Sequence, residues 1–104
     1  RHADLWGDKG LLHLLLGELE ESRVSLAECL QQPFCPQSAE RGARFNLACV
    51  YARLSQPDEC RSELTIAVSK GFRTKRRDLL DDPDLASVRA QAWFQQIAET
   101  MPIE

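Results

Sequence analysis

The sequence lacks the patterns from which a β-sheet, a membrane span or a phosphate site would be predicted. No stretch of useful length alternates apolar and polar residues, so we predict no β-strand. The longest apolar run, Gly10–Gly17, is interrupted by His13 and is far too short to cross a bilayer. There is no glycine-rich phosphate loop, and the net charge of −3 gives no overall attraction to nucleic acid or an anionic membrane. We therefore expect neither a nucleic-acid nor a membrane partner.

Histidines are scarce, and no acid, base or nucleophile forms a recognisable cluster. His2 and His13 are the only histidines, and we expect His13 to be buried or half-buried in a helix pair. The acidic run Asp81-Asp82 with Asp84 lacks the ligand spacing of a calcium loop and is better explained as helix capping. We accordingly expect no catalytic residue, no metal and no cofactor, and predict that the chain is not an enzyme.

The four cysteines do not form a zinc or redox motif. Cys29, Cys35, Cys49 and Cys60 include no pair spaced C-x-x-C. We expect free, reduced thiols in a cytoplasmic protein, with Cys29, Cys49 and Cys60 packed as small apolar residues. Cys35 lies between two prolines, so it is expected to be the most exposed of the four.

Glycine and proline divide the chain into stretches with helical periodicity. The composition is ordinary for a globular domain, with 43% apolar and 28% charged residues. Apolar residues three and four apart predict amphipathic helices, which Gly17, Pro33 and Gly71 would end. The expected helices span residues 4–16, 18–32, about 39–54 and 57–70, and a fifth begins at Asp82-Pro83. Whether residues 74–80 form a further short helix is left open.

The first two helices resemble the next two in sequence. Aligning Gly17 with Ser55 gives a period of about 38 residues. It superposes Trp6 on Arg44, Gly10 on Ala48, His13 on Tyr51, Ser22 on Cys60, Leu26 on Leu64, and Cys29-Leu30 on Ala67-Val68. Small residues such as Gly10 and Ala48 would let paired helices approach closely.

At these positions the chain resembles the tetratricopeptide repeat (TPR) family. The motif residues in the first unit are Trp6, Gly10, Gly17, Leu26, Cys29 and Leu30, and the second unit contains the segment 45–54, FNLACVYARL. The resemblance implies an all-α fold of antiparallel helix-turn-helix pairs, stacked as a short α-solenoid with a C-terminal capping helix. The expected single domain has repeats at 4–36 and 39–72 and a connector and cap at 73–104. The start at Arg1 suggests a piece of a longer protein with further repeats before it.

The resemblance also implies a function, which is to bind a peptide or helix of another protein on the concave face. The first helix of each pair would line that groove. The residues are Asp4, Gly7, Asp8, Leu11, Leu14 and Leu15 in the first repeat and Gly42, Phe45, Asn46, Cys49, Ala52 and Arg53 in the second. Several of the leucines in 11–16 must face away from the second helix, so a homo-oligomer through this helix is also considered. The alternative is a non-catalytic regulatory or oligomerisation appendage of a larger multidomain enzyme.

One basic cluster remains, formed by Arg73, Lys75, Arg76 and Arg77. It is either a solvated connector or an anchor for an acidic peptide or a phosphate. It has no interleaved aromatic residues, which makes single-stranded nucleic acid a poor ligand for it.

Overall fold

The computed structural model describes residues 2–104, and all of its regular structure is helical. The elements are α1 (His2–Leu15), α2 (Leu19–Gln31), α3 (Gln37–Arg53), α4 (Pro57–Ser69), α5 (Arg76–Asp81), the 3-10 helix η1 (Pro83–Val88) and α6 (Ala92–Glu99). No strand occurs among these residues. The predicted all-α class is confirmed, and the stretch left open at 74–80 contains the short helix α5.

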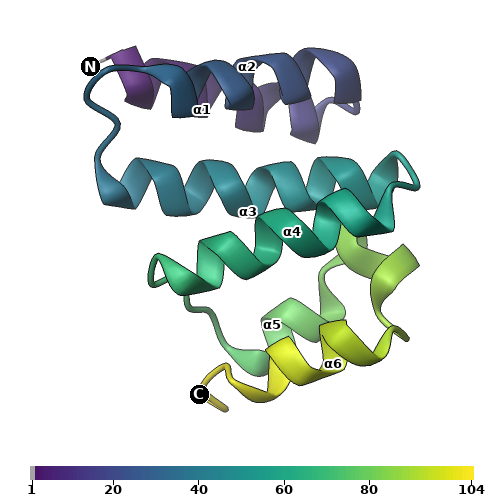
Figure 1. Ribbon diagram of the computed structural model, residues 1–104. Helices are drawn as coiled ribbons and strands as arrows, with labels where there is room; N and C mark the ends of the chain where they lie inside the picture. Colours follow the sequence, from purple (N-terminus) through teal and green to yellow (C-terminus); the bar gives the residue numbers. More distant parts are fainter. Residues whose placement is uncertain (1) are drawn as a thin grey trace.

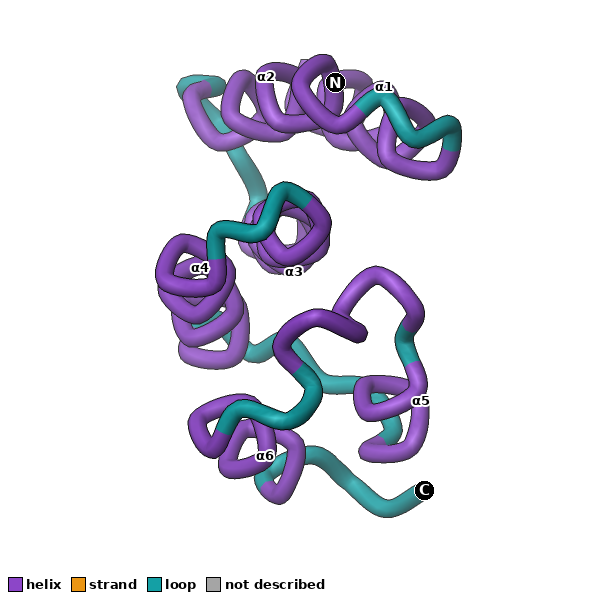
Figure 2. The backbone as a smooth tube through the Cα atoms, turned by 90° about the vertical axis from the view of Figure 1, so that its right-hand side faces the viewer, coloured by secondary structure: helices purple, strands orange, loops and turns teal. Residues whose placement is uncertain are grey.

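The helices form three layers stacked along the long axis of the molecule (Figures 1 and 2). The antiparallel pair α1/α2 lies above the pair α3/α4, and α5, η1 and α6 lie below. The N-terminus belongs to the top layer and the C-terminus to the bottom layer. Helix α3 is therefore the centre of the stack, since it packs on α1, α2, α4 and η1.

The two helical pairs repeat with one period. Helix α4 begins at Pro57 and ends at Ser69, each 38 residues after the corresponding ends of α2. The turn of each pair contains a residue with positive φ, Gly17 at 77° and Ser55 at 61°. The amide of Gly17 donates to Leu14 O in the first turn, as the amide of Ser55 donates to Ala52 O in the second. This confirms the alignment of Gly17 with Ser55.

The closest helix contact in the first pair depends on Gly10. A Cβ placed on Gly10 would lie 2.5 Å from side-chain carbons of Leu26 and 3.3 Å from its backbone nitrogen. The hydroxyl of buried Ser22 donates to Gly10 O at 2.7 Å, which satisfies it in the apolar interface. At the equivalent place in the second pair Ala48 is fully buried, so the predicted small positions lie where the helices meet.

The C-terminal segment differs from the single fifth helix that the sequence predicted. Asp82 caps η1 as expected, accepting from the Asp84 amide at 2.9 Å. The chain then turns at Ala90-Gln91, where Gln91 has extended backbone angles, and α6 starts at Ala92. The division lets Leu85 and Phe94 both reach the core, where both are completely buried. A second difference is at α3, which starts at Gln37 directly after Pro36 rather than at residue 39.

Candidate binding cleft between α1 and α3

A cleft of about 150 Å³ separates the first helices of the two pairs. Its lining comes from α1 and α3 alone: Ala3, Asp4, Gly7, Asp8 and Leu11 on one side, and Ser38, Ala39, Gly42, Ala43 and Asn46 on the other. The spacing of three and four residues puts each set on one helix face. The cleft thus follows the line along which the two helices pack.

Small side chains keep this cleft open. A Cβ placed on Gly42 would meet nothing within 4 Å, and one on Gly7 would only touch Cys29 Sγ at 3.6 Å. Neither glycine has the positive φ that would require it for backbone reasons. The space above Gly42 is therefore free to accept an atom from another molecule.

The charges in the cleft are of one sign. Asp4 and Asp8 are both exposed and, among the residues that the structure describes, are the only ionisable ones in its lining. Within residues 2–104 neither carboxylate forms an ion pair, and Asn46 and Ser38 add uncharged polar groups. An acidic cleft with an apolar end at Leu11 favours a cationic, partly apolar ligand.

Six of the predicted groove residues meet here, namely Asp4, Gly7, Asp8 and Leu11 of α1 and Gly42 and Asn46 of α3. Asp8 and Leu11 of α1 lie across the cleft from Asn46 of α3. Leu15 is 74% exposed near the C-terminal end of α1, outside the cleft. Phe45 is half-buried and stacks on Phe72, with ring centroids 4.4 Å apart, so it packs against the linker after α4 instead.

The prediction that Leu14, Cys49 and Ala52 line a partner groove is wrong, because all three side chains are in the core. Leu14 is 2% exposed and Cys49 is 1% exposed. On α3 the reason is η1, which packs on the face that contains Cys49. Arg53, also predicted for the groove, is engaged within the chain, because its guanidinium donates to Leu14 O and contacts Asp84 at 3.4 Å.

Several lining residues were absent from the predicted set, namely Ala3, Ser38, Ala39 and Ala43. Early helix starts explain two of them: α3 begins at Gln37 and not at residue 39, which adds Ser38, and α1 begins at His2 and not at residue 4, which adds Ala3. The series 39, 42, 43 and 46 does have helical spacing, so the sequence contained a signal for the rest.

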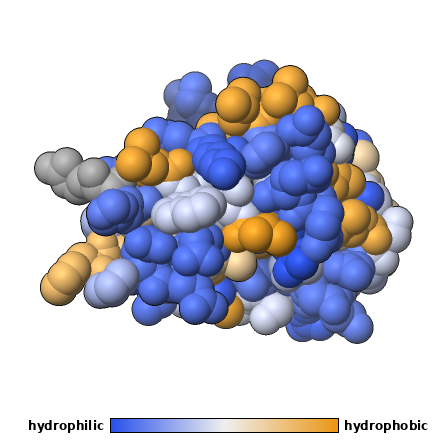
Figure 3. Space-filling view, turned by 90° about the horizontal axis from the view of Figure 1, so that it is seen from above, coloured by the Kyte–Doolittle hydropathy of each residue, from blue (hydrophilic) through white to orange (hydrophobic). Residues whose placement is uncertain are grey.

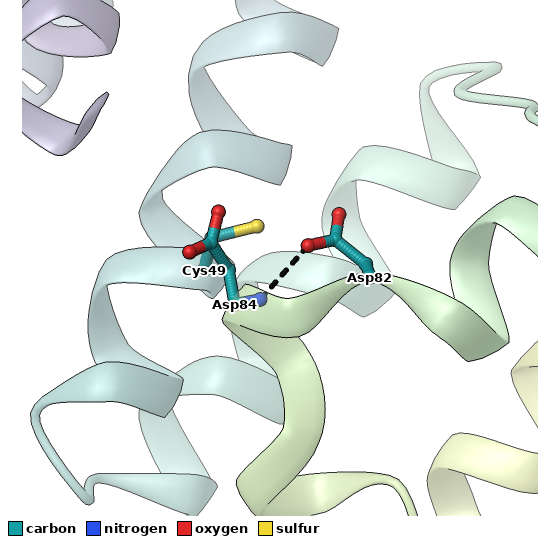
Figure 4. A group of neighbouring side chains, drawn as sticks. All are labelled: Cys49, Asp82 and Asp84. Atoms are coloured by element: carbon teal, nitrogen blue, oxygen red, sulfur yellow. Dashed lines mark hydrogen bonds between the residues drawn. The ribbon is translucent and has the colours of Figure 1, made fainter.

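A thiol and two carboxylates come together where η1 begins (Figure 4). One ligand atom each of Cys49, Asp82 and Asp84 lies within 4.8 Å of the others. Asp82 is committed to capping η1, and Asp84 to the ion pair with Arg53. Burial raises the pKa of the Cys49 thiol far above its usual range and also raises the pKa of Asp82, so metal binding would have to displace protons and existing bonds. The arrangement is accounted for by capping and packing.

The basic cluster is divided between two roles. The guanidinium of Arg73 donates to Val68 O and Phe72 O at the end of α4, and that of Arg76 donates to Ala98 O, Glu99 O and Met101 O at the end of α6. Helix C-termini leave such carbonyls without partners, so these two arginines serve the fold. Lys75 and Arg77 line a hollow with Leu80 and Ile103, together with Arg76 and Glu104. Of the four residues expected to anchor an acidic ligand, only Lys75 and Arg77 form no hydrogen bond or ion pair with their side chains within residues 2–104.

The thiols are arranged as the sequence predicted. All four cysteines are free, and Cys29, Cys49 and Cys60 are buried, whereas Cys35 is partly exposed. Burial raises the pKa of Cys29 and of Cys60 to about 11. Reaction with thiol reagents needs the thiolate, so Cys35 is expected to react first.

His13 is half-buried in the last turn of α1, where its Nδ1 lies 2.7 Å from a Glu18 carboxylate oxygen. This agrees with the expected packing role. Among residues 2–104 no helix is long and apolar enough to span a bilayer.

Comparison of the sequence with protein-family models and curated proteins, and of the structure with solved structures, finds no match. The function of the chain therefore has to be argued from its own residues.

Proposed function

We propose that this chain is a TPR-like protein-interaction module, without catalytic activity, that binds a basic segment of another protein in the cleft between α1 and α3. The observation that carries the proposal is the lining of that cleft, with Asp4 and Asp8 at one wall and open space above Gly42 at the other. The same helices, the first of each pair, are those that the resemblance to TPR proteins assigns to ligand binding.

The expected ligand has lysine or arginine next to an apolar residue. Its cations would approach Asp4 and Asp8, and its apolar side chain would reach Leu11 across the small floor residues. The amide side chain of Asn46 can hydrogen-bond the backbone of such a segment. Because the two carboxylates are exposed, their attraction would act mainly on association rate and selectivity, and it would weaken with salt.

The test uses two labelled peptides of leucine, alanine and lysine patterned as an amphipathic helix, the second with glutamate replacing every lysine. Fluorescence anisotropy should detect binding of the lysine peptide only, with affinity that falls as salt is added. Asp4→Asn with Asp8→Asn should weaken binding and flatten the salt dependence.

Gly42→Leu provides the steric arm of the same test. The added side chain enters open space and replaces a glycine inside a helix, so the melting temperature should stay equal or rise. Binding should weaken about tenfold or more, which corresponds to about 1.4 kcal/mol. Ser62→Leu, on the exposed surface of α4, adds the same side chain outside the cleft and should leave binding unchanged. Equal binding of both peptides, or normal binding by the folded Gly42→Leu protein, would contradict the proposal.

A further inference from the structure

The outward face of α1 is apolar, although no other element within residues 2–104 covers it. Leu5, Leu12 and Leu16 are 64%, 56% and 62% exposed. Their spacing of seven and four residues places them on one stripe, on the far side of the helix from buried Leu14. Seen from above, apolar side chains gather between polar ones on this end of the molecule (Figure 3). Exposed apolar stripes of this kind mark interaction sites in soluble domains.

The same stripe exists on α3, where two of its three residues are buried and the third, Leu54, is half-buried. With the 38-residue period, Leu5, Leu12 and Leu16 correspond to Ala43, Val50 and Leu54. Ala43 is 3% exposed and Val50 is completely buried.

The neighbours of α3 show what covers that stripe. Ala43 lines the cleft opposite α1, whereas the carbonyl of Ala52 accepts from the Ser87 hydroxyl of η1. The side of α3 opposite to Ala52 is therefore turned toward the first pair, which packs on α3 through both α1 and α2. On α3 an antiparallel helix pair covers the positions that α1 leaves exposed.

Lys9 is the one charged residue in the stripe, at the position of buried Leu47 on α3. Its ammonium lies 5.0 Å from the centre of the Trp6 ring, so the charge leans toward the edge of the face. The methylene stem can then lie along the leucines, and the stripe remains suitable for apolar packing.

We propose that the outer face of α1 is a docking surface for an antiparallel helical pair of the same polypeptide, packed on α1 as α1/α2 packs on α3. The occupant is a helical pair with a face like the one by which α1/α2 packs on α3. In a second copy of this chain no such face is free. In that copy, α3 covers this face of α1/α2, and α5, η1 and α6 cover the equivalent face of α3/α4. A short linker suffices for the connection, because residues 32–36 alone join α2 to α3.

The probe is the chain's own first pair. A second copy of residues 2–39 is placed before residues 2–104, so that its Ala39 is joined directly to His2. The α1 of the complete chain, called the inner α1, then takes the place that the chain from Glu40 onward has in the natural sequence. Because each repeat is stabilised by its neighbour, amide hydrogen exchange in the inner α1 should slow by about tenfold or more relative to the single chain. An inner α1 that exchanges as fast as before would overturn the proposal.

A matched pair of substitutions on the inner α1 identifies the face. Leu12→Glu lies in the stripe and should abolish the slower exchange. Leu15→Glu makes the same chemical change on the same helix, at a 74% exposed leucine off the stripe, and should preserve it. If both substitutions act alike, the docking surface is not this stripe.

Two further results complete the test. The inner Leu5→Ala, Lys9→Leu, Leu12→Val variant reproduces the α3 stripe of Ala43, Leu47, Val50 and Leu54 and should increase the protection. If amide exchange in the inner α1 stays fast in this variant as well, a poor fit between the added pair and the stripe cannot explain the result, and the proposal fails. If the single chain instead sediments as a dimer that Leu12→Glu dissociates and Leu15→Glu does not, the occupant is a second copy and the proposal is likewise wrong.

Discussion

Helices α1 and α3 hold the same position in two successive pairs, yet their surroundings differ on one side. Each packs on its own second helix through a small residue, Gly10 or Ala48. Helix α3 has helices above and below it, whereas α1 has them only below. One local sequence pattern can thus produce a core helix or a surface helix, depending on where it lies in the stack.

The two pairs also differ in the side chain at one equivalent position of their first helices, near the contact with the second helix. Trp6 in the first pair corresponds to Arg44 in the second. Arg44 Nη1 lies 2.9 Å from a Glu63 carboxylate oxygen, and Glu40 is a further acidic neighbour at 3.7 Å. A half-buried ion pair therefore occupies a place that an indole occupies in the first pair, and the pair still forms.

The largest expected difference between the pairs is the response to a polar residue on the outer stripe. Val50→Gln should destabilise the protein by about 3 kcal/mol or more, because it buries an amide without partners. Leu12→Gln, at the equivalent exposed position, should stay within about 0.5 kcal/mol. Urea unfolding of both variants measures this, and similar losses at both sites would mean that α1 is covered in solution.

The next comparison concerns the closest approach of the paired helices. Gly10→Ala should cost about 1–3 kcal/mol, because its Cβ would overlap Leu26. Leu26→Ala should cost about 2–5 kcal/mol by itself, but it also removes the overlap. The double variant should therefore be more stable than the sum of the two losses implies. Additive losses would show that the backbone, rather than the leucine, gives way. Ala48→Gly in the second pair, which removes a methyl and adds no overlap, should cost about 1 kcal/mol.

Alkaline pH should destabilise both pairs through their buried thiols. Cys29 in the first pair and Cys60 in the second have a folded-state pKa of about 11, above the ordinary value of 9.0. The protonated thiol is favoured in the folded state, so this stability is complete below pH 9 and is lost as pH rises through 11. Each thiol should reduce the free energy of unfolding by about 1.4 kcal/mol per pH unit within that window.

Urea titrations in reductant between pH 8.5 and 10.5 would measure this slope, which Cys29→Ala and Cys60→Ala should each reduce. Cys35→Ala, at the partly exposed cysteine, is the control and should not alter it. A slope that is independent of all three cysteines would show that other groups govern alkaline unfolding.

The smallest expected effect is at the two turns. Gly17 and Ser55 both have left-handed backbone angles, which only glycine adopts without cost. Gly17→Ala should cost about 1 kcal/mol, whereas Ser55→Gly should be neutral or stabilising by a few tenths, about 0.5 kcal/mol at most. Thermal melts can resolve these opposite signs, and a loss at Ser55→Gly would indicate that the serine hydroxyl itself stabilises the turn.

Much of the fold could be predicted because its determinants are local. Gly17, Pro57 and Gly71 mark helix ends by their own backbone preferences, and the repeat is visible as residue pairs at one spacing. The run of leucines between residues 11 and 16 was harder, since apolar composition alone does not say that Leu14 faces inward and Leu15 outward. That distinction depends on where α3 lies, which is a tertiary property.

The return of η1 to α3 left no comparable local signal. Leu85 and Val88 are completely or almost completely buried, but their spacing fits one continuous helix as well as a short 3-10 turn. Cys49 consequently looked like an accessible groove residue, although the chain covers it with a segment more than thirty residues later. The α1/α3 cleft was found more readily, because the 38-residue period aligns Asp4 and Asp8 of one wall with Gly42 and Asn46 of the other.

The late position of η1 in the sequence has a consequence for the order of events during synthesis. Domains form from the N-terminus as the chain is made, and α1 to α4 are complete before Pro83 has been added. Until η1 emerges, the face of α3 that contains Cys49 has no cover of its own. In the nascent chain this thiol is therefore open to oxidants and to chaperones that recognise apolar surface, and in the finished chain it is sealed.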